Sequence, residues 1–138
     1  MIGPFLRRLA REAAWAPISV VILHAVAGAI FGHEPYVDTI MHFLGGVAMA
    51  YFIHRACELG PDVLGHVTLL GQTVLVFAVT CTAATFWEFG EFARDRLFDS
   101  NVQLSLANTM RDLLLGCLGA LVFLAFRGSV RSSSRLAP

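Results

Sequence analysis

The sequence predicts an all-α protein, a four-helix transmembrane bundle in a single domain, and three observations support this fold class. The first is composition: 57% of the residues are hydrophobic and 14% are charged, whereas roughly a quarter of a soluble domain is charged. The mean hydropathy of +0.68 agrees with this. The second is a set of four long apolar segments, and the third is the polar, turn-like stretches that separate them. Together they indicate a multi-pass membrane protein.

The four apolar segments approach the length of about 20 residues that a helix needs to cross a bilayer. The predicted helices cover residues 13–31, 39–56, 63–95 and 104–126. Charged, turn-like stretches separate them at residues 32–35, 58–62 and 94–103; the first two contain glycine and proline, and the third contains Asp99-Ser100-Asn101. A basic, serine-rich tail over residues 127–138 completes the single domain, residues 1–138, and is expected to be flexible and to touch lipid.

The basic residues set the expected orientation. All ten are arginines, and most of them fall on one side of the predicted bundle. These are Arg7, Arg8, Arg11, Arg55, Arg127, Arg131 and Arg135. Because positively charged loops stay in the cytoplasm, both termini are predicted to be cytoplasmic, in the inner membrane of a bacterium. A basic start before an apolar run is also typical of a secretory signal, but the further apolar helices favour a membrane span.

Ionisable residues inside the apolar helices form the candidate site, since such residues are costly in a membrane unless they have partners. Asp38 and His42 begin the second helix, Glu88 to Asp95 end the third, and Asn108 to Asp112 begin the fourth. In this topology all three groups lie toward the non-cytoplasmic side. Spacings of three, four and seven residues place each group on one helix face, so three polar stripes should meet in the outer half of the bundle.

A divalent metal ion is the cofactor that this residue set suggests, although its identity stays open. Carboxylate oxygens suit hard cations, and an added imidazole extends the choice to zinc, manganese or iron. The predicted metal ligands are Asp38, His42, Glu88, Glu91, Asp95 and Asp112. The predicted catalytic residues are Glu88, Glu91 and Asp112, with Asp38 and Asp95 orienting them. No established catalytic motif, such as H-E-x-x-H, occurs in the sequence, so whether the protein is an enzyme is left open.

Short motifs in the last three helices carry a family resemblance. The run from Asn108 to Leu113, the pair Asp38 and His42, and the pair Glu88 and Glu91 after Trp87 stand in order along the chain. With these motifs the sequence resembles the YjdF-like group of small bacterial inner-membrane proteins and, more distantly, the VanZ-like family.

The resemblance implies the membrane fold and the importance of the polar stripes, but no substrate. VanZ-like proteins are associated with glycopeptide resistance through a step at the cell surface. The family usually has an acid where this chain has Asn108 and an asparagine where it has Gly116. A metal site here would therefore have one carboxylate fewer.

Several interpretations of function remain at this stage. The leading one is a small membrane protein with an acidic and histidine-containing cation site, acting on a lipid or lipid-linked component of the cell envelope. One alternative is a non-enzymatic accessory or structural subunit, in which Arg111 pairs with Glu88 or Glu91 as an internal salt bridge. Another is a proton or ion pathway, which the isolation of His24 on an apolar face disfavours. His33 and Glu34 lie on the predicted loop nearest the site; a solvated loop is the favoured interpretation for them, and membership of the site is the alternative.

The expected partners are membrane lipids, with a homo-oligomer or a larger membrane complex as further options. The formal net charge of zero gives no support for nucleic acid binding. Three cysteines, far apart in the sequence and in no metal-ligand spacing, imply no disulfide framework.

Overall fold

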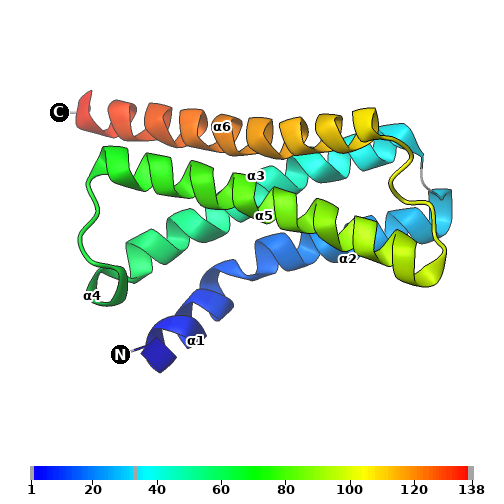
Figure 1. Cartoon of the computed structure of the whole chain (residues 1–138). Helices are drawn as coiled ribbons and strands as arrows, with labels where there is room; N and C mark the ends of the chain where they lie inside the picture. Colours follow the sequence, from blue (N-terminus) through cyan, green and yellow to red (C-terminus); the bar gives the residue numbers. More distant parts are fainter. Residues whose placement is uncertain (1, 33, 137–138) are drawn as a thin grey trace.

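Helices make up the whole fold in the computed structural model, which describes residues 2–32 and 34–136, with side chains up to residue 128. These residues contain no strand. The helices are α1 (Ile2–Ala13), α2 (Trp15–Phe31), α3 (Pro35–Leu59), α4 (Pro61–Leu64), α5 (Leu69–Phe98) and α6 (Leu106–Leu136) (Figure 1). Within the described residues, three helices are long and apolar enough to cross a membrane, or four if the bent pair α1 and α2 is one span. The all-α transmembrane fold class is confirmed.

Pro17 explains why the first apolar segment follows a separate helix, with a bend of 52° between α1 and α2. Proline lacks an amide hydrogen, and its ring clashes with the carbonyl four residues earlier, here that of Ala13, where α1 ends. The nearby carbonyl oxygen of Glu12 accepts hydrogen bonds from the Trp15 indole (3.1 Å) and the Tyr51 hydroxyl (3.3 Å). The Glu12 carbonyl therefore has hydrogen-bond donors at the bend, and the bond from Tyr51 connects α1 to α3.

The predicted third span, residues 63–95, is broken near its start, because residues 65–68 are not helical and separate α4 from α5. Gly65 has a φ of +80°, which glycine adopts without steric cost. Thr68 then caps α5, since its hydroxyl accepts a hydrogen bond from the backbone amide of Gly71 (3.1 Å). The prediction of a helix through residues 65–68 is wrong.

The second and fourth spans are longer than predicted. α3 begins at Pro35, a residue whose fixed φ suits the first helical position, so Asp38 lies in the first turn of the helix. α6 continues to Leu136, so the backbone of the expected flexible tail is helical as far as it is described. The arginine and serine side chains of that tail beyond residue 128 lie outside the described residues.

Glycines bring α3 and α6 into close contact at the centre of the bundle. A Cβ atom built on Gly46 would collide with the backbone of Gly116, and one on Gly119 would collide with the backbone at Phe43. The two helices therefore pack backbone against backbone, as small residues permit in membrane proteins. α3 also packs against α1, α2 and α5, whereas α2 packs against α1 and α3 and not closely against α5.

Large apolar side chains lie mainly on the outside of the bundle. Ile22, Leu70, Phe86 and Leu114 are among the many that are more than half exposed. The interior is built instead from small or medium residues such as Ala50, Val76 and Ala120. This distribution matches a helix bundle surrounded by lipid, because exposing apolar side chains to hydrocarbon chains costs no free energy, whereas exposing them to water does.

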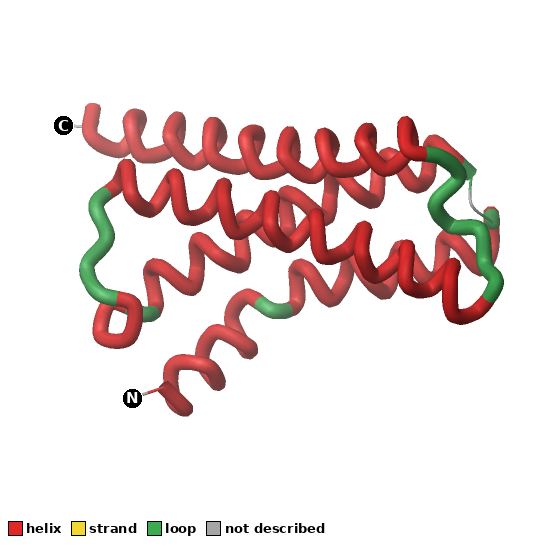
Figure 2. Tube along the Cα trace, viewed as in Figure 1, coloured by secondary structure: helices red, strands yellow, loops and turns green. Residues whose placement is uncertain are grey.

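The loops lie at the two ends of the bundle (Figure 2). The loop over residues 99–105 lies at one end, together with the start of α3 and the ends of α2 and α5. α1 begins and α6 ends at the opposite end, where α4 also lies (Figure 1). Sequence-distant polar residues on α3, α5 and α6 can therefore meet at a single end.

Candidate functional site

His42 lies at the middle of a cluster of acidic side chains near the loop end of the bundle. Only 8% of its side chain is exposed. Its Nε2 atom lies 3.3 Å from Oδ1 of Asp38, one turn earlier on α3, and 4.0 Å from Oε1 of Glu91. Its Nδ1 atom lies 3.5 Å from Oε1 of Glu88. We call Asp38, His42, Glu88, Glu91 and Asp112 the His42 centre.

Glu88 and Glu91 reach the centre from α5, where a spacing of three residues places them on one face. Both are buried, and only 4% of the Glu88 side chain is exposed. The Gln103 amide donates hydrogen bonds to Oε2 of Glu88 (3.0 Å) and to its backbone oxygen (2.9 Å). The Trp87 indole donates one to Oε1 of Glu91 (2.8 Å). Each glutamate therefore has one dedicated donor that fixes its carboxylate.

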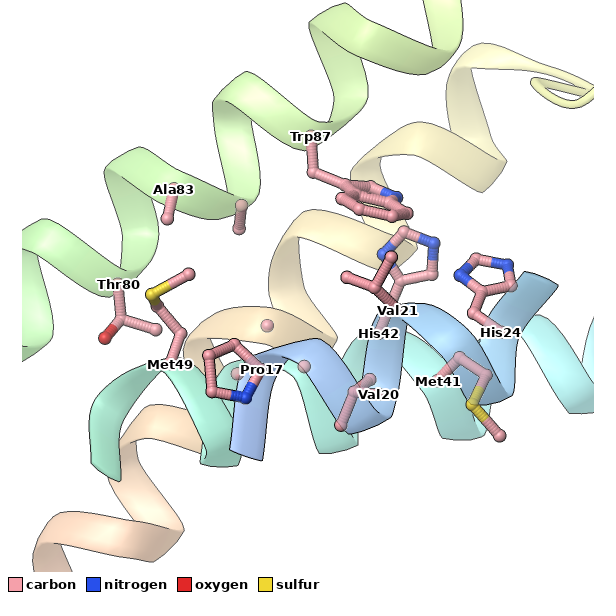
Figure 3. A pocket seen from close by; sticks show the side chains of 14 residues that line it. Pro17, Val20, Val21, His24, Met41, His42, Met49, Thr80, Ala83 and Trp87 are labelled. Carbon is pink, nitrogen blue, oxygen red and sulfur yellow. The ribbon is translucent and has the colours of Figure 1, made fainter. Parts of the chain in front are cut away.

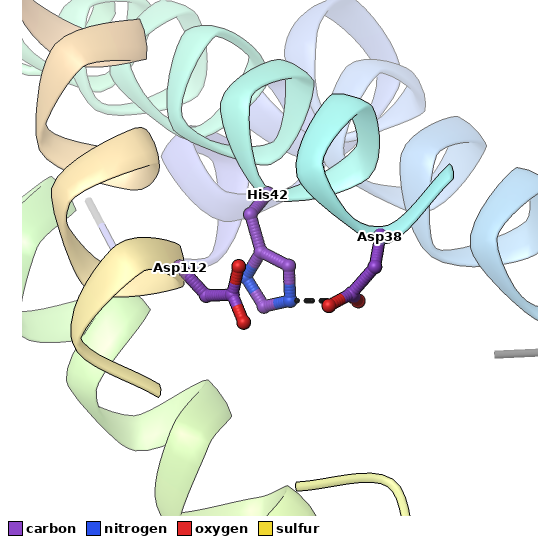
Figure 4. Close-up of side chains that lie close together, drawn as sticks. All are labelled: Asp38, His42 and Asp112. Atoms are coloured by element: carbon purple, nitrogen blue, oxygen red, sulfur yellow. Dashed lines mark ion pairs between the residues drawn. The ribbon is translucent and has the colours of Figure 1, made fainter. Parts of the chain in front are cut away.

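Asp112 reaches the centre from α6 and is fully buried. Figure 4 shows its carboxylate beside the ring of His42, with Asp38 on the other side of that ring. The Asn108 amide and the Arg111 guanidinium both donate to Asp112, the latter over 3.0 Å. Arg111 also donates to Oδ2 of Asp38 (3.2 Å) and to Asn108 (2.8 Å). The arginine thus joins α6 to α3.

The partner predicted for Arg111 is therefore wrong. The structure pairs it with Asp38 and Asp112 and not with Glu88 or Glu91. Helical spacing shows that Arg111 and Asp112 are neighbours on α6, but it does not show which neighbouring helix the guanidinium faces.

Asp95 is not brought into the cluster, although the sequence places it on the same face of α5. Its carboxylate accepts hydrogen bonds from the Ser100 hydroxyl (2.6 Å) and from the backbone amides of Val102 and Gln103 (both 2.9 Å). These bonds fold the loop after α5 back onto the helix. Since Gln103 in turn hydrogen-bonds Glu88, this loop links Asp95 to the centre, and the orienting role of Asp95 stays a prediction.

His24 joins the edge of the centre, contrary to the expectation that it is isolated on an apolar face. Its Nε2 atom lies 3.7 Å from Oδ1 of Asp38, and its ring stacks on Trp87 with centroids 5.7 Å apart. The ring also meets that of His42 edge-on. A signal for this was present in the sequence: His24 lies eight residues before Gly32, which follows α2, and His42 lies eight residues after Glu34, which precedes α3. His33 itself lies outside the described residues.

Two buried polar atoms of the centre have no hydrogen-bond partner among the described residues: Nε2 of His42 and Oε1 of Glu88. Buried polar atoms are nearly always satisfied in folded proteins, so such atoms point to a missing ligand or water. Two overlapping groups have ligand atoms within 4.8 Å of one another. They are Asp38, His42 and Asp112, and His42, Glu88 and Glu91. The oxygen and imidazole donors fit a divalent cation.

Comparison with known families gives one match. The model of a family described as "Predicted membrane protein (DUF2238)" matches residues 6–133, nearly the whole chain. The chain belongs to this family. No curated protein and no solved structure matches it significantly.

An apolar cavity of about 100 Å³ adjoins the His42 centre of this DUF2238 protein (Figure 3). His24, His42 and Trp87 line one end of the cavity, and Met49 and Thr80 line the other. Glycines and alanines of α3, α5 and α6 form much of the remaining wall. The centre in this DUF2238 member therefore borders space of hydrocarbon character within the membrane-spanning part of the bundle.

Proposed function

We propose that the protein binds a divalent cation at the His42 centre and that this centre acts on a lipid or lipid-linked component of the cell envelope. The observation that carries the proposal is the pair of buried atoms that lack a hydrogen bond, Nε2 of His42 and Oε1 of Glu88, inside two overlapping groups of metal-ligand type. A cation gives these atoms a partner and offsets the negative charge of four carboxylates gathered in a small volume.

The residues of the centre have distinct proposed roles. Glu88, Glu91 and Asp112 hold the cation or move protons, and His42 contributes to both ligand groups. Asp38 orients His42 across 3.3 Å, and Asp95 orients Glu88 through Gln103. When bound, a divalent cation would supply Lewis acidity that polarises a phosphoryl or carbonyl oxygen.

The cellular setting is part of the proposal. The arginines at the end where α1 begins and α6 ends support a cytoplasmic location for that end, in a bacterial inner membrane. The His42 centre then faces the outer leaflet, where envelope lipids are exposed. The motifs around Asp38, Glu88 and Asn108 support a relation to the YjdF-like group and, more distantly, to VanZ-like proteins.

Metal analysis of purified protein tests the proposal directly. Glu88→Gln and Asp112→Asn each keep the size of the side chain and remove its negative charge, so both should lower the bound metal to below a tenth of the wild-type content. Asp62→Asn is the matched control, because Asp62 is exposed at the opposite end of the bundle and should keep the wild-type content. Equal metal content in all four proteins, measured by mass spectrometry of the elements, would refute the cation site.

A purely structural role for the cluster is the second candidate, and the geometry of Arg111 favours it. Its guanidinium bonds Asp38, Asn108 and Asp112 and so links α3 to α6 without any ligand. In an accessory subunit of a larger complex, or in a homo-oligomer, such a network would fix how the helices pack. A metal-free protein that co-purifies with a stoichiometric partner from native membranes would favour this role over the cation site.

A further inference from the structure

A groove with a volume of about 560 Å³ lies between α2 and α5, at the loop end of the bundle. Most of its lining is apolar: Val21, Ala25, Gly28 and Ala29 from α2, Phe86, Trp87 and Gly90 from α5, and Val102 from the following loop. Its polar lining consists of His24, Glu91 and Arg94. The groove exists because α2 and α5 do not pack closely on each other.

Two glycines keep the groove open. A Cβ atom built on Gly28 of α2 or on Gly90 of α5 would have no atom within 4 Å. These positions are thus unlike Gly46 and Gly119, where a side chain would strike the backbone of a neighbouring helix. Close helix packing does not explain Gly28 and Gly90, whereas room for a bound molecule does.

The groove changes in character along its length. Arg94 lies one turn before the end of α5, and its guanidinium forms no ion pair with any described residue. Deeper in the bundle the lining is hydrocarbon, and His24 and Trp87 also border the apolar cavity beside the His42 centre. The groove thus has a cationic end near the membrane surface and an apolar stretch toward the membrane interior. This distribution of charge and polarity complements an anionic amphiphile.

We propose that this groove binds an anionic phospholipid, with the headgroup phosphate at Arg94 beside the His42 centre and one acyl chain along Gly28 and Gly90. Charge complementarity supports this occupant, because a phosphate gives Arg94 a counterion. Glu91 lines the same groove and would repel a phosphate unless a cation offsets its charge. The inference therefore rests on the proposed function, and it names phospholipids as the substrate class of the same centre.

Native mass spectrometry of the full-length, delipidated protein tests the proposal by titration with phosphatidylglycerol. The double variant Gly28→Leu/Gly90→Leu directs two apolar side chains into the groove from positions where a Cβ meets no atom within 4 Å. Leucine is also a better helix former than glycine, so the fold should be kept. We expect this variant to lose at least tenfold in affinity for the first bound lipid. Gly128→Leu is the control, because Gly128 has equally open surroundings far from the groove and should bind lipid as the wild type does.

The headgroup and the chain are tested separately. Arg94→Gln should remove the preference for phosphatidylglycerol over diacylglycerol, which lacks the phosphate, while inorganic phosphate alone should bind to none of the proteins. Undiminished lipid affinity in the groove-filled variant, or equal binding of diacylglycerol by the wild type, would overturn the proposal.

Metal content separates this inference from the proposed function. The groove-filled variant should keep wild-type metal, since neither glycine belongs to the His42 centre or supplies a metal ligand. If the groove-filled variant keeps both its metal and its lipid affinity, the lipid-binding proposal is contradicted and the cation site is not. If the wild-type protein contains no metal, the cation site is contradicted.

Discussion

Each ring nitrogen of His42 faces a carboxylate on a different helix. Nε2 faces Asp38 of α3, and Nδ1 faces Glu88 of α5. A neutral imidazole carries a hydrogen on only one nitrogen, and an ionised carboxylate has none to donate. Both contacts are therefore favourable only with an added proton, on the ring or on one of the carboxylates, or with a cation among the carboxylates. This conflict at one residue is the physical basis for a ligand at the centre.

Gln103 offers a test at the residue scale that leaves every proposed ligand in place. In Gln103→Ala the carboxylate of Glu88 loses its side-chain donor and becomes free to rotate, so affinity for the cation should fall about 10–100-fold. Isothermal titration calorimetry with Zn²⁺ or Mn²⁺ measures the change. Gln72→Ala, at the other end of the bundle, should leave the affinity unaltered. Equal affinities of the two variants would mean that Gln103 does not position Glu88 for a cation.

Which residues lie together was predictable only where helical phase determines it. The spacings of Asp38 with His42 and of Glu88 with Glu91 placed four members of the centre correctly, and that of Asn108 with Asp112 placed the fifth. Phase does not give the rotation of one helix against another, so the partners of Arg111 were missed. The hydrogen bonds that hold Asp95 come from a loop, whose path no periodicity describes.

At the scale of elements, α3 and α6 pack so closely that their backbones touch at glycines. Gly46 lies against the backbone of Gly116, one turn beyond His42 on α3 and one turn beyond Asp112 on α6. This proximity sets the distance between the two helices directly below the centre. In the sequence, Gly46 and Gly116 each follow a member of the centre by four residues, so they continue the polar stripes of both helices.

Gly46→Ala should destabilise the protein by about 1–3 kcal/mol, because the added methyl group forces α3 and α6 apart. Gly28→Ala should be neutral or stabilising by up to about 1 kcal/mol, since its Cβ meets no atom and alanine is the better helix former. Reversible chemical unfolding in detergent micelles measures both changes. If the two variants were equally stable, the close contact between α3 and α6 would not exist in solution.

The helix boundaries were harder to predict than the helices. Hydropathy identifies the spans because each span must place apolar residues across the bilayer. It carries no information on the backbone conformations that interrupt a helix. The break at residues 65–68 depends on the positive φ of Gly65 and the cap at Thr68, and the bend before α2 depends on Pro17. In both places a local backbone requirement outweighs an apolar composition.

For the whole molecule, the orientation of the bundle in the membrane decides which side the His42 centre faces. The His42 centre, the groove and the loop over residues 99–105 lie at one end, and the start of α1 and the end of α6 lie at the other. If the arginine-rich end is cytoplasmic, every element of the proposed site belongs to the outer half of the membrane.

Single cysteines in a cysteine-free variant test the orientation. Asn101→Cys, in the loop beside the centre, should react with a membrane-impermeant maleimide in intact spheroplasts. Asp62→Cys, at the opposite end, should react only after the membrane is permeabilised. The reverse labelling pattern would show that the centre faces the cytoplasm, and would leave the fold itself unchallenged.

The link that Arg111 makes between α6 and α3 has a consequence for biosynthesis. α6 leaves the ribosome after α3 and α5, so Asp38 and Glu88 reach the membrane before Arg111 and Asp112 can join them there. During that interval Asp38 lacks the guanidinium that later bonds it. Because an unpaired charge is costly in lipid, the nascent chain must keep these residues near water or protonated until α6 arrives. The order of synthesis thus delays assembly of the centre until α6 has entered the membrane.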